Sequence, residues 1–303
     1  MQFRQLGKNG PEVSAIGLGT WPIGGGLGHV EEQQGIAVVR AAIDSGITLL
    51  DTAQSYYTSE DTLGKALKDG YRERCFLCTK VGSGYSRNDI QNAMDNSLRG
   101  LGVDHVDLYQ IHDWKSEYPI DKSMEAMARL QEQGKTRFIG VSNFNAEQMR
   151  LALQTAPFQS NQPRYNMFSR RIEPEDIPFC EQEGIGILPH SPLSQGLLTG
   201  TYAPGHLFPE DDARSRKSHF QGEKFASYLA SSERLKDIAT EKGVTLIQLA
   251  LAWILRLPAI SCVLVGAKTT EQLREHIGAA DVVFSQEELD RIDSVLASAP
   301  KGL

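Results

Sequence analysis

The sequence predicts an α/β fold, a (β/α)8 TIM barrel in which eight parallel strands alternate with helices. Three observations predict it. Eight short apolar runs recur along the chain, amphipathic helical patterns lie between them, and glycines stand where those helices should stop. Consecutive strands joined through helices are parallel, and periodicity alone would also allow an open doubly wound sheet. The count of eight favours a closed barrel, which places chemistry at the carboxyl ends of the strands.

The elements are expected in alternating order. The apolar runs that predict strands are Ala15–Leu18, Thr48–Asp51, Phe76–Val81, Val106–His112, Thr136–Ser142, Ser160–Tyr165, Ile185–Pro189 and Cys262–Val265. The helical patterns are Glu32–Ser45, Glu60–Lys68, Asn88–Gly100, Asp121–Gln133, Ala146–Thr155, Pro174–Glu183, Ser232–Leu255, Glu271–Ile277 and Gln286–Ala297. The glycines that mark helix ends are Gly46, Gly70, Gly102, Gly134, Gly184 and Gly243. The segment Thr201–Ser231 is too long and polar for a simple connection, so we expect it to lie over the barrel mouth as a flap.

Composition narrows the class of protein. The 303 residues are 40% hydrophobic and contain no linker-like stretch, which predicts a single domain over residues 1–303. A net charge of −7 argues against nucleic acid or an anionic membrane as the partner. No signal peptide or membrane span is evident, so a cytoplasmic protein is expected. Cys75 and Cys78 form a CxxC, but residues three apart on a strand point to opposite faces, and no metal site is predicted.

Ionisable residues end three successive predicted strands. Asp51 follows the second apolar run, Lys80 the third and His112 the fourth. Neighbouring strand ends in a barrel lie within side-chain reach, so Lys80 is the expected partner of Asp51, and Tyr56 on the following loop can join them. Any one of these alone is more often a solvated charge or a hydrogen-bonded core histidine. Four at three consecutive strand ends predict a site.

The chemistry of this group fits proton donation. A phenol with a pKa of ~10 is a poor acid at neutral pH. The Lys80 ammonium is expected to lower the pKa of Tyr56, with Asp51 holding the ammonium and His112 orienting a carbonyl. The group contains no evident nucleophile, so the electrons must come from elsewhere.

Seven segments, in order along nearly the whole chain, resemble the aldo-keto reductases. They are GLGTW (Gly17–Trp21), LLDTAQSYYTSEDTLG (Leu49–Gly64), LCTKVG (Leu77–Gly82), DLYQIHDW (Asp107–Trp114), GKTRFIGVSNF (Gly134–Phe144), LPHSPLSQGLLTG (Leu188–Gly200) and LVGAKTTEQL (Leu264–Leu273). The flap sequence looks closest to the bacterial branch with inositol-locus and general-stress reductases, near potassium-channel β subunits.

The resemblance implies a barrel plugged at its bottom by an N-terminal β-hairpin, Gln2–Val13, and a hydride supplied by NADPH. It implies that Tyr56 is the general acid, that Lys80 and Asp51 tune it, and that His112 orients the substrate carbonyl. It also implies that cofactor-binding residues are Gly19, Thr20, Trp21, Asp51, Ser142, Asn143, Gln162, His190, Ser191, Pro192, Leu193, Gln195, Arg214, Gly266, Lys268, Gln272, Glu275 and His276.

Within that set, the resemblance assigns three tasks. Ser142, Asn143 and Gln162 hold the nicotinamide carboxamide. Lys268 meets the 2′-phosphate, Arg214 clamps a phosphate as a planar fork, and Gln272, Glu275 and His276 meet the adenine. Because this cofactor site uses no GxGxxG, the glycines of Gly24–Gly28 are interpreted as a flexible loop.

Two residues depart from the family pattern. His190 stands where an aromatic residue, commonly Tyr, stacks on the nicotinamide, and His276 stands where Asn is common. A histidine there is expected to titrate near pH 6.5 and, once protonated, to repel NADP⁺ more than NADPH.

Two other functions compete with reduction. A regulatory module like a channel β subunit would keep the fold and the cofactor while turning over slowly. A barrel glycoside hydrolase would need two acids at strand ends, whereas only Asp51 is suitable. A small-molecule carbonyl is the expected substrate, and Trp21, Tyr57 and Trp114 favour small aldehydes or sugar-like carbonyls. The oligomeric state is left open.

Overall fold

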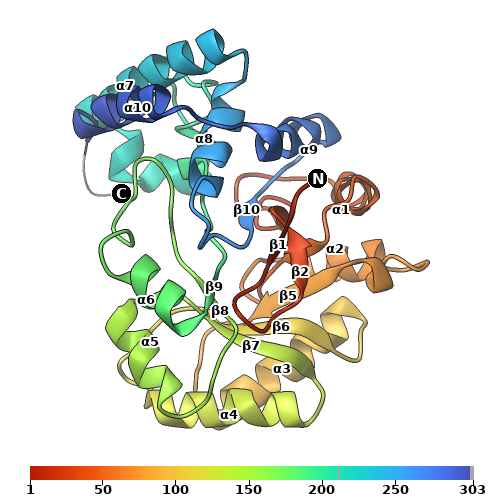
Figure 1. The fold of residues 1–303 in the computed structure, drawn as a ribbon. Coiled ribbons are helices and arrows are strands. Elements are labelled where there is room, and N and C mark those ends of the chain that lie inside the picture. The colour runs from red at the N-terminus through yellow and green to blue at the C-terminus, as the bar shows by residue number, and fades with distance from the viewer. Residues whose placement is uncertain (211, 301–303) are drawn as a thin grey trace.

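A computed structural model describes residues 1–210 and 212–300. Asp211 of the expected flap, and residues 301–303 of the expected domain, lie outside the described residues. Eight parallel strands form one sheet in the order β10-β3-β4-β5-β6-β7-β8-β9 (Figure 1). The strands are β3 (Ile16–Gly19), β4 (Leu49–Asp51), β5 (Phe76–Lys80), β6 (Val106–Ile111), β7 (Thr136–Ser142), β8 (Ser160–Gln162), β9 (Gly186–Ile187) and β10 (Val263–Val265).

The two edge strands of this sheet meet and complete the barrel. Ile187 of β9 forms an isolated parallel bridge with Ile260, just before β10. The backbone N–H of Ser261 donates to Ile187 O at 3.0 Å, and that of Leu264 donates to Pro189 O at 2.9 Å. The predicted barrel is therefore confirmed. The expected run Ser160–Tyr165 is shortened to β8, which ends before Pro163, since proline has no N–H to donate to a ladder.

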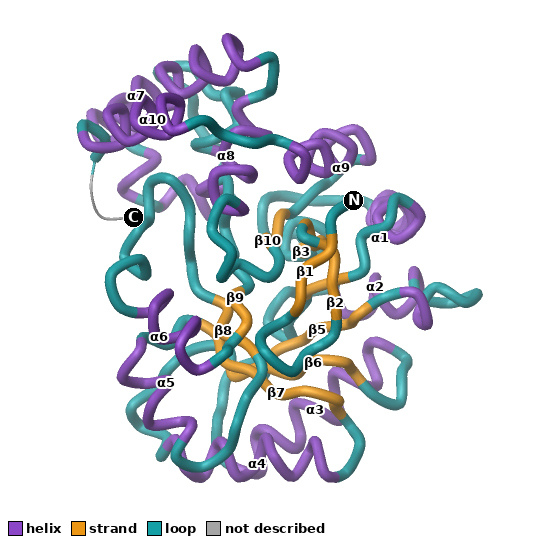
Figure 2. Tube along the Cα trace, in the orientation of Figure 1, coloured by secondary structure: helices purple, strands orange, loops and turns teal. Residues whose placement is uncertain are grey.

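Helices surround the strands, which gather in the centre of the molecule (Figure 2). They are α1 (Glu32–Asp44), α2 (Ser59–Ala66), α3 (Arg87–Leu101), α4 (Ile120–Glu132), α5 (Ala146–Leu153), α6 (Asp176–Glu183), α7 (Gly222–Lys242), α8 (Leu246–Leu255), α9 (Thr270–Ile277) and α10 (Gln286–Ala297). Their apolar faces pack on the outside of the barrel in one large core.

The expected single helical pattern Ser232–Leu255 is wrong, because the structure has two helices there. Gly243 ends α7 in the left-handed conformation with φ 76°, and the Thr245 side chain caps α8 through a capping box with Gln248. The axes of α7 and α8 differ by 88°. The helix α7 also begins earlier than expected, so the last ten residues of the predicted flap are helical.

The predicted hairpin plug is confirmed at the bottom of the barrel. It consists of β1 (Phe3–Gln5) and β2 (Glu12–Ser14), which pair antiparallel. Leu6 and Val13 of this hairpin are fully buried in a cluster with residues at the start of the barrel strands, among them Leu49 and Phe76. The opposite, carboxyl end of the strands is thereby left as the place for a site.

One further sequence expectation, on Cys75 and Cys78, is answered by the packing. Cys75 belongs to the core between barrel and helices, whereas Cys78 belongs to the cluster inside the barrel, as expected for opposite strand faces. No group of three or more His, Cys, Asp or Glu in the described part of the chain is arranged to hold a metal. No single described helix is long and apolar enough to cross a membrane. The bent pair α7 and α8 passes only by length and composition, and α8 is buried.

Candidate active site

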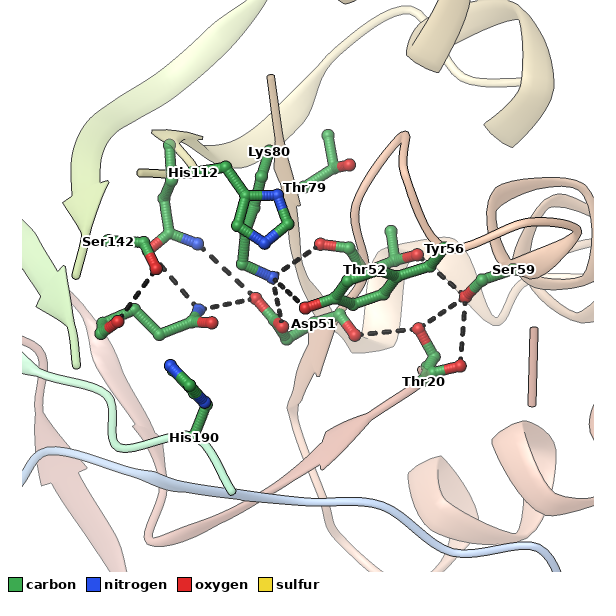
Figure 3. Close-up of polar contacts among 12 residues, drawn as sticks. Thr20, Asp51, Thr52, Tyr56, Ser59, Thr79, Lys80, His112, Ser142 and His190 are labelled. Carbon is green, nitrogen blue, oxygen red and sulfur yellow. Dashed lines mark hydrogen bonds and ion pairs between the residues drawn. The ribbon is translucent and has the colours of Figure 1, made fainter. Parts of the chain in front are cut away.

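Two neighbouring strands, β4 and β5, and the loop that follows β4 bring Asp51, Lys80 and Tyr56 into contact (Figure 3). Asp51 ends β4 and Lys80 ends β5, so both side chains lie at the carboxyl end of the barrel. Lys80 Nζ donates to Asp51 Oδ2 at 2.6 Å, to Thr52 O at 2.9 Å and to Tyr56 OH at 3.4 Å. Lys80 is 0% exposed and Asp51 3% exposed. The carboxylate at the end of this buried strand thus offsets the cost of burying the ammonium.

The second oxygen of Asp51 is also occupied. Gln162 Nε2 of β8 donates to Asp51 Oδ1 at 2.8 Å, and Gln110 Nε2 of β6 approaches the same oxygen at 3.5 Å. Gln110 is not among the residues predicted from the sequence, because that prediction rests on ionisable side chains. The available signal was its position two residues before His112, because alternate residues of a strand share a face.

Burial changes the acid–base properties of this group in a direction the sequence did not predict. Burial lowers the pKa of Lys80, but the Asp51 carboxylate and the Tyr56 phenol outweigh it, so the net pKa is raised and the ammonium stays charged. The pKa of Tyr56 is also raised, because burial and the charge of Asp51 outweigh the lowering effect of Lys80. The expectation of a lowered phenol pKa is therefore wrong for this structure. Tyr56 therefore holds its proton more firmly and stays a neutral phenol.

His112 follows β6 and faces the phenol. The rings of Tyr56 and His112 are 5.7 Å apart and nearly perpendicular. Burial, with Lys80 and Lys115 adding to it, lowers the pKa of His112 to about 3. The imidazole is therefore neutral at physiological pH and offers a hydrogen bond without a charge.

The hydroxyl groups of Thr20, Thr52 and Ser59 brace the loop between β4 and α2 that carries Tyr56. Ser59 Oγ, at the start of α2, donates to Thr20 Oγ1 at 2.7 Å and lies 2.8 Å from Thr52 Oγ1 (Figure 3). Thr20 Oγ1 in turn donates to Asp51 O at 2.8 Å. These contacts tie the ends of β3 and β4 to the start of α2, on either side of the loop that carries Tyr56. Thr20, expected at the cofactor, is fully buried and serves this bracing network.

A cavity of about 790 Å³ extends from Tyr56 towards α9. Among the expected cofactor-binding residues, those that line it are Gly19, Trp21, Asp51, His190, Ser191, Pro192, Leu193, Gln195, Arg214, Gly266, Lys268, Gln272, Glu275 and His276. Ser142, Asn143 and Gln162 lie at the buried ends of β7 and β8, joined by the bond from Ser142 Oγ to Gln162 O at 2.9 Å. These three residues do not line the cavity, but Gln162 Nε2 donates to Asp51 and Asn143 Oδ1 faces His190 Nε2, and both partners do line it.

His190 is held in one neutral form by its neighbours. Asn143 Nδ2 donates to Asp113 Oδ1 at 2.9 Å, so its Oδ1 is the acceptor that faces His190 Nε2 at 2.9 Å. His190 Nδ1 then accepts from Ser191 Oγ at 3.0 Å. Burial, followed by the charges of Arg164 and Lys80, lowers the pKa of His190 to about 3. The expectation that His190 titrates near pH 6.5 is therefore wrong, because burial and the nearby cations disfavour the charged imidazole.

This neutral histidine predicts a pH effect on stability. The folded protein keeps His190 neutral down to about pH 3, whereas the unfolded chain takes up a proton near pH 6.5. Acid therefore favours unfolding, and between pH 6.5 and 5 this residue alone accounts for about 2 kcal/mol. We expect His190→Tyr to lose less stability than wild type over that interval in urea unfolding. Equal losses would show that His190 is protonated in the folded protein.

The flap places further cations along the cavity. The Arg214 guanidinium bonds both oxygens of Asp212, Nε to Oδ1 at 2.9 Å and Nη2 to Oδ2 at 2.5 Å. Its phosphate-clamping role stays a prediction, because Asp212 occupies the fork. Lys217 Nζ donates to Gln195 Oε1 at 2.8 Å, and Arg164 also lines the cavity. Lys217 and Arg164 were missed, since single basic residues in polar loops carry no signal in one sequence.

Strained backbone gathers around this cavity. Among the described non-glycine residues with positive φ, all except Asp69 lie in loops at the carboxyl end of the barrel: Tyr57, Asn143, Ser191, Ser194 and Gln195. Such conformations cost of order 1–3 kcal/mol each and persist where the surroundings require them. Their location marks the loops after β4, β7 and β9 as shaped for a task beyond stability.

A buried ion pair that contacts a phenol at the end of a long cavity, at the carboxyl end of a barrel, is typical of an enzyme's active site. Residues 15–297 match the Aldo/keto reductase family, and the chain belongs to that family. It is 37% identical to the aldo-keto reductase YhdN of Bacillus subtilis (strain 168), covering 98% of this chain and 94% of that protein. It is 33% identical to the aldo-keto reductase yakc [NADP(+)] of Schizosaccharomyces pombe, covering 99% and 94%.

Solved structures agree with the sequence relatives. The glycerol dehydrogenase AKR11B4 from Gluconobacter oxydans superposes with a TM-score of 0.87 at 32% identity, covering 97% of this chain and 94% of that one. The protein is therefore an oxidoreductase of the aldo-keto reductase class. This assignment sets aside the glycoside hydrolase alternative.

Proposed function

We propose that the protein reduces small aldehydes and ketones to alcohols with NADPH, and that Tyr56 supplies the proton. The observation that carries the proposal is the buried contact of Lys80 with both Asp51 and Tyr56 at the end of the long cavity. When bound, NADPH supplies the hydride to the carbonyl carbon and leaves as NADP⁺. One carbonyl, one hydride and one proton then give one alcohol.

The side chains divide the remaining work. Neutral His112 donates a hydrogen bond that orients the carbonyl oxygen beside the phenol. Tyr56 gives its proton to that oxygen as negative charge develops on it. The Lys80 ammonium, held by Asp51, stabilises the phenolate that remains and so lowers the cost of the transfer. Solvent then restores the proton to Tyr56.

Several features of the cavity fit NADPH. The buried Nδ1 of His276 has no hydrogen-bond partner, and His276 lines the cavity at the end expected for the adenine. Lys268 stands just before α9, whose N-terminal N–H groups favour an anion. Lys268 Nζ donates to Leu27 O of the glycine loop, so a 2′-phosphate there would join or replace this contact.

Replacing Lys268 by Ala is expected to weaken NADPH much more than NADH, because only NADPH carries the 2′-phosphate. A charge-assisted contact contributes roughly 1.5–3 kcal/mol, which corresponds to about tenfold to over a hundredfold in Kd. Fluorescence titration of wild type and variant with both cofactors measures the difference. Equal weakening of the two would mean that Lys268 does not contact the phosphate.

Steady-state oxidation of NADPH with a panel of aldehydes tests the proposed function. Turnover at rates typical of enzymes, ~1–1,000 per second, supports it. Tight NADPH binding with no turnover on any aldehyde would instead favour the regulatory module, which keeps the fold and the cofactor but not fast catalysis.

A further inference from the structure

The glycine loop, Gly24–Gly28, folds back on the residues that precede it. The backbone N–H of Gly26 donates to Trp21 O at 3.0 Å, a bond that stays within one short segment. Such a bond fixes the local shape of the loop but does not fasten the loop to the rest of the barrel. Trp21 and Leu27 both line the cavity that also contains Tyr56, so the position of the loop affects the wall of the site.

A single hydrogen bond ties the glycine loop to a distant part of the chain. Lys268 Nζ donates to Leu27 O, 241 positions away, and among the hydrogen bonds of the described residues this is the one that reaches the loop from another part of the chain. The backbone of Lys268 is itself held, because its N–H donates to Gln272 Oε1 at 2.8 Å and its O accepts from Gln34 Nε2 at 2.7 Å. The lysine is thus a fixed point that holds the loop.

The glycine loop packs directly on Trp21. A Cβ added to Gly26 would lie 2.1 Å from Trp21 Nε1 and 2.2 Å from Trp21 Cε2, so only a glycine allows this approach. A Cβ added to Gly24 would likewise lie 2.1 Å from Tyr56 O. The backbone of the loop therefore lies against both the indole ring and the backbone of Tyr56. Any movement of the loop changes the packing of the indole.

A 2′-phosphate at Lys268 would compete with the glycine loop for the same ammonium. The Nζ that donates to Leu27 O is the group proposed to meet the 2′-phosphate of NADPH. A phosphate dianion attracts an ammonium more strongly than a neutral carbonyl does, and the N–H groups at the start of α9 favour the anion as well. Leu27 is only half-buried, so its carbonyl can turn to solvent when the lysine leaves it.

We propose that Lys268 is a positioning residue for Trp21, acting through the glycine loop, and that a 2′-phosphate releases this hold. Without the phosphate, Lys268 fixes the loop and the loop fixes the indole. With the phosphate, the loop and the indole are free to adjust to the substrate. Ile23 is buried in the core, so the change is confined to the loop and the Trp21 side chain. The wall that an aldehyde meets thus depends on whether the cofactor carries the phosphate. This inference rests on the proposed use of NADPH.

Two fragments of the cofactor test the release without the nicotinamide. Adenosine 2′,5′-bisphosphate and adenosine 5′-phosphate differ in the 2′-phosphate alone, and neither carries a ring that could touch Trp21. Saturation with the bisphosphate should speed hydrogen exchange of the Gly26 amide ~10-fold to ~100-fold, which corresponds to the loss of one charge-assisted hydrogen bond. It should also shift the indole N–H resonance of Trp21, assigned with Trp21→Phe. Saturation with the monophosphate should do neither.

The variant Lys268→Met separates the hold on the loop from phosphate binding. In the unliganded variant, the Gly26 amide should already exchange ~10-fold to ~100-fold faster than in wild type, and the bisphosphate should add nothing. Lys236→Met is the matched control, because it removes a lysine of α7 that pairs with Glu233, and it should behave as wild type. The indole of Trp253, buried on α8, should not shift in any of these samples.

Three outcomes would count against the proposals in different ways. Slow exchange of the Gly26 amide in unliganded Lys268→Met would overturn the inference, because Lys268 would then not hold the loop. Tight binding of the bisphosphate with no change at Gly26 and Trp21 would also overturn it, while the proposed NADPH contact would stand. If the bisphosphate binds no more tightly than the monophosphate, the proposed NADPH contact fails and the release fails with it. The unliganded variant then still measures the hold of Lys268 on the loop.

Discussion

Replacing Tyr56 by Phe is expected to abolish aldehyde reduction while leaving NADPH binding nearly unchanged. The substitution removes only the phenol oxygen, to which Lys80 Nζ is 3.4 Å away, and keeps the ring that packs near His112. Loss of a positioned general acid typically costs 10²- to 10⁴-fold in kcat, so a fall of at least ~100-fold is expected. Steady-state NADPH oxidation measures kcat, and fluorescence titration measures the cofactor Kd. A variant that kept a tenth of the wild-type kcat would exclude Tyr56 as the acid.

Replacing Lys80 by Met is expected to damage both activity and stability. The variant leaves Asp51 buried at 3% exposure with hydrogen bonds from Gln162 and Gln110 but without its cation. Breaking a buried ion pair by removing one partner costs roughly 3–5 kcal/mol. The phenol also loses the ammonium that stabilises its phenolate, so kcat falls as well. Urea unfolding and steady-state kinetics measure the two effects.

The double variant Asp51→Leu with Lys80→Met separates these two effects. It removes both charges, so a large part of the stability lost in Lys80→Met should return. Activity should not return, because no cation is left beside Tyr56. Recovery of both properties together would mean that the ion pair serves folding alone.

The strand-end group was predictable because each ionisable residue directly follows a short apolar run. Asp51, Lys80 and His112 each end or follow a strand, and these strands are neighbours in the barrel. Residues that end consecutive strands in the sequence therefore lie close together in the structure. The fold followed from the same regularity, because parallel neighbours in a barrel are consecutive in sequence.

The properties that depend on surroundings were not predictable from order alone. The direction of the Tyr56 pKa depends on how far burial outweighs a nearby cation, and sequence shows the cation but not the burial. His190 is neutral because it is buried near Arg164 and Lys80, and its tautomer is set by Asn143, which lies 47 positions away just after β7. The boundary between α7 and α8 depends on Gly243, which adopts the left-handed conformation. The sequence marks Gly243 as a helix end, but the helical pattern continues past it and predicts a single helix.

Arg4 of the hairpin has a consequence for how the chain folds. Its guanidinium donates to Leu255 O at 2.7 Å and to Ile260 O at 2.9 Å, the latter 256 positions along the chain. Strand β3 likewise pairs with β10. Because synthesis proceeds from the N-terminus, β3 can pair with β4 early, but its other edge stays unpaired until β10, the last strand, is made. Contacts of such separation are slow to form. We therefore expect the nascent barrel to expose an unpaired strand edge until translation is nearly complete, which is the state that chaperones recognise.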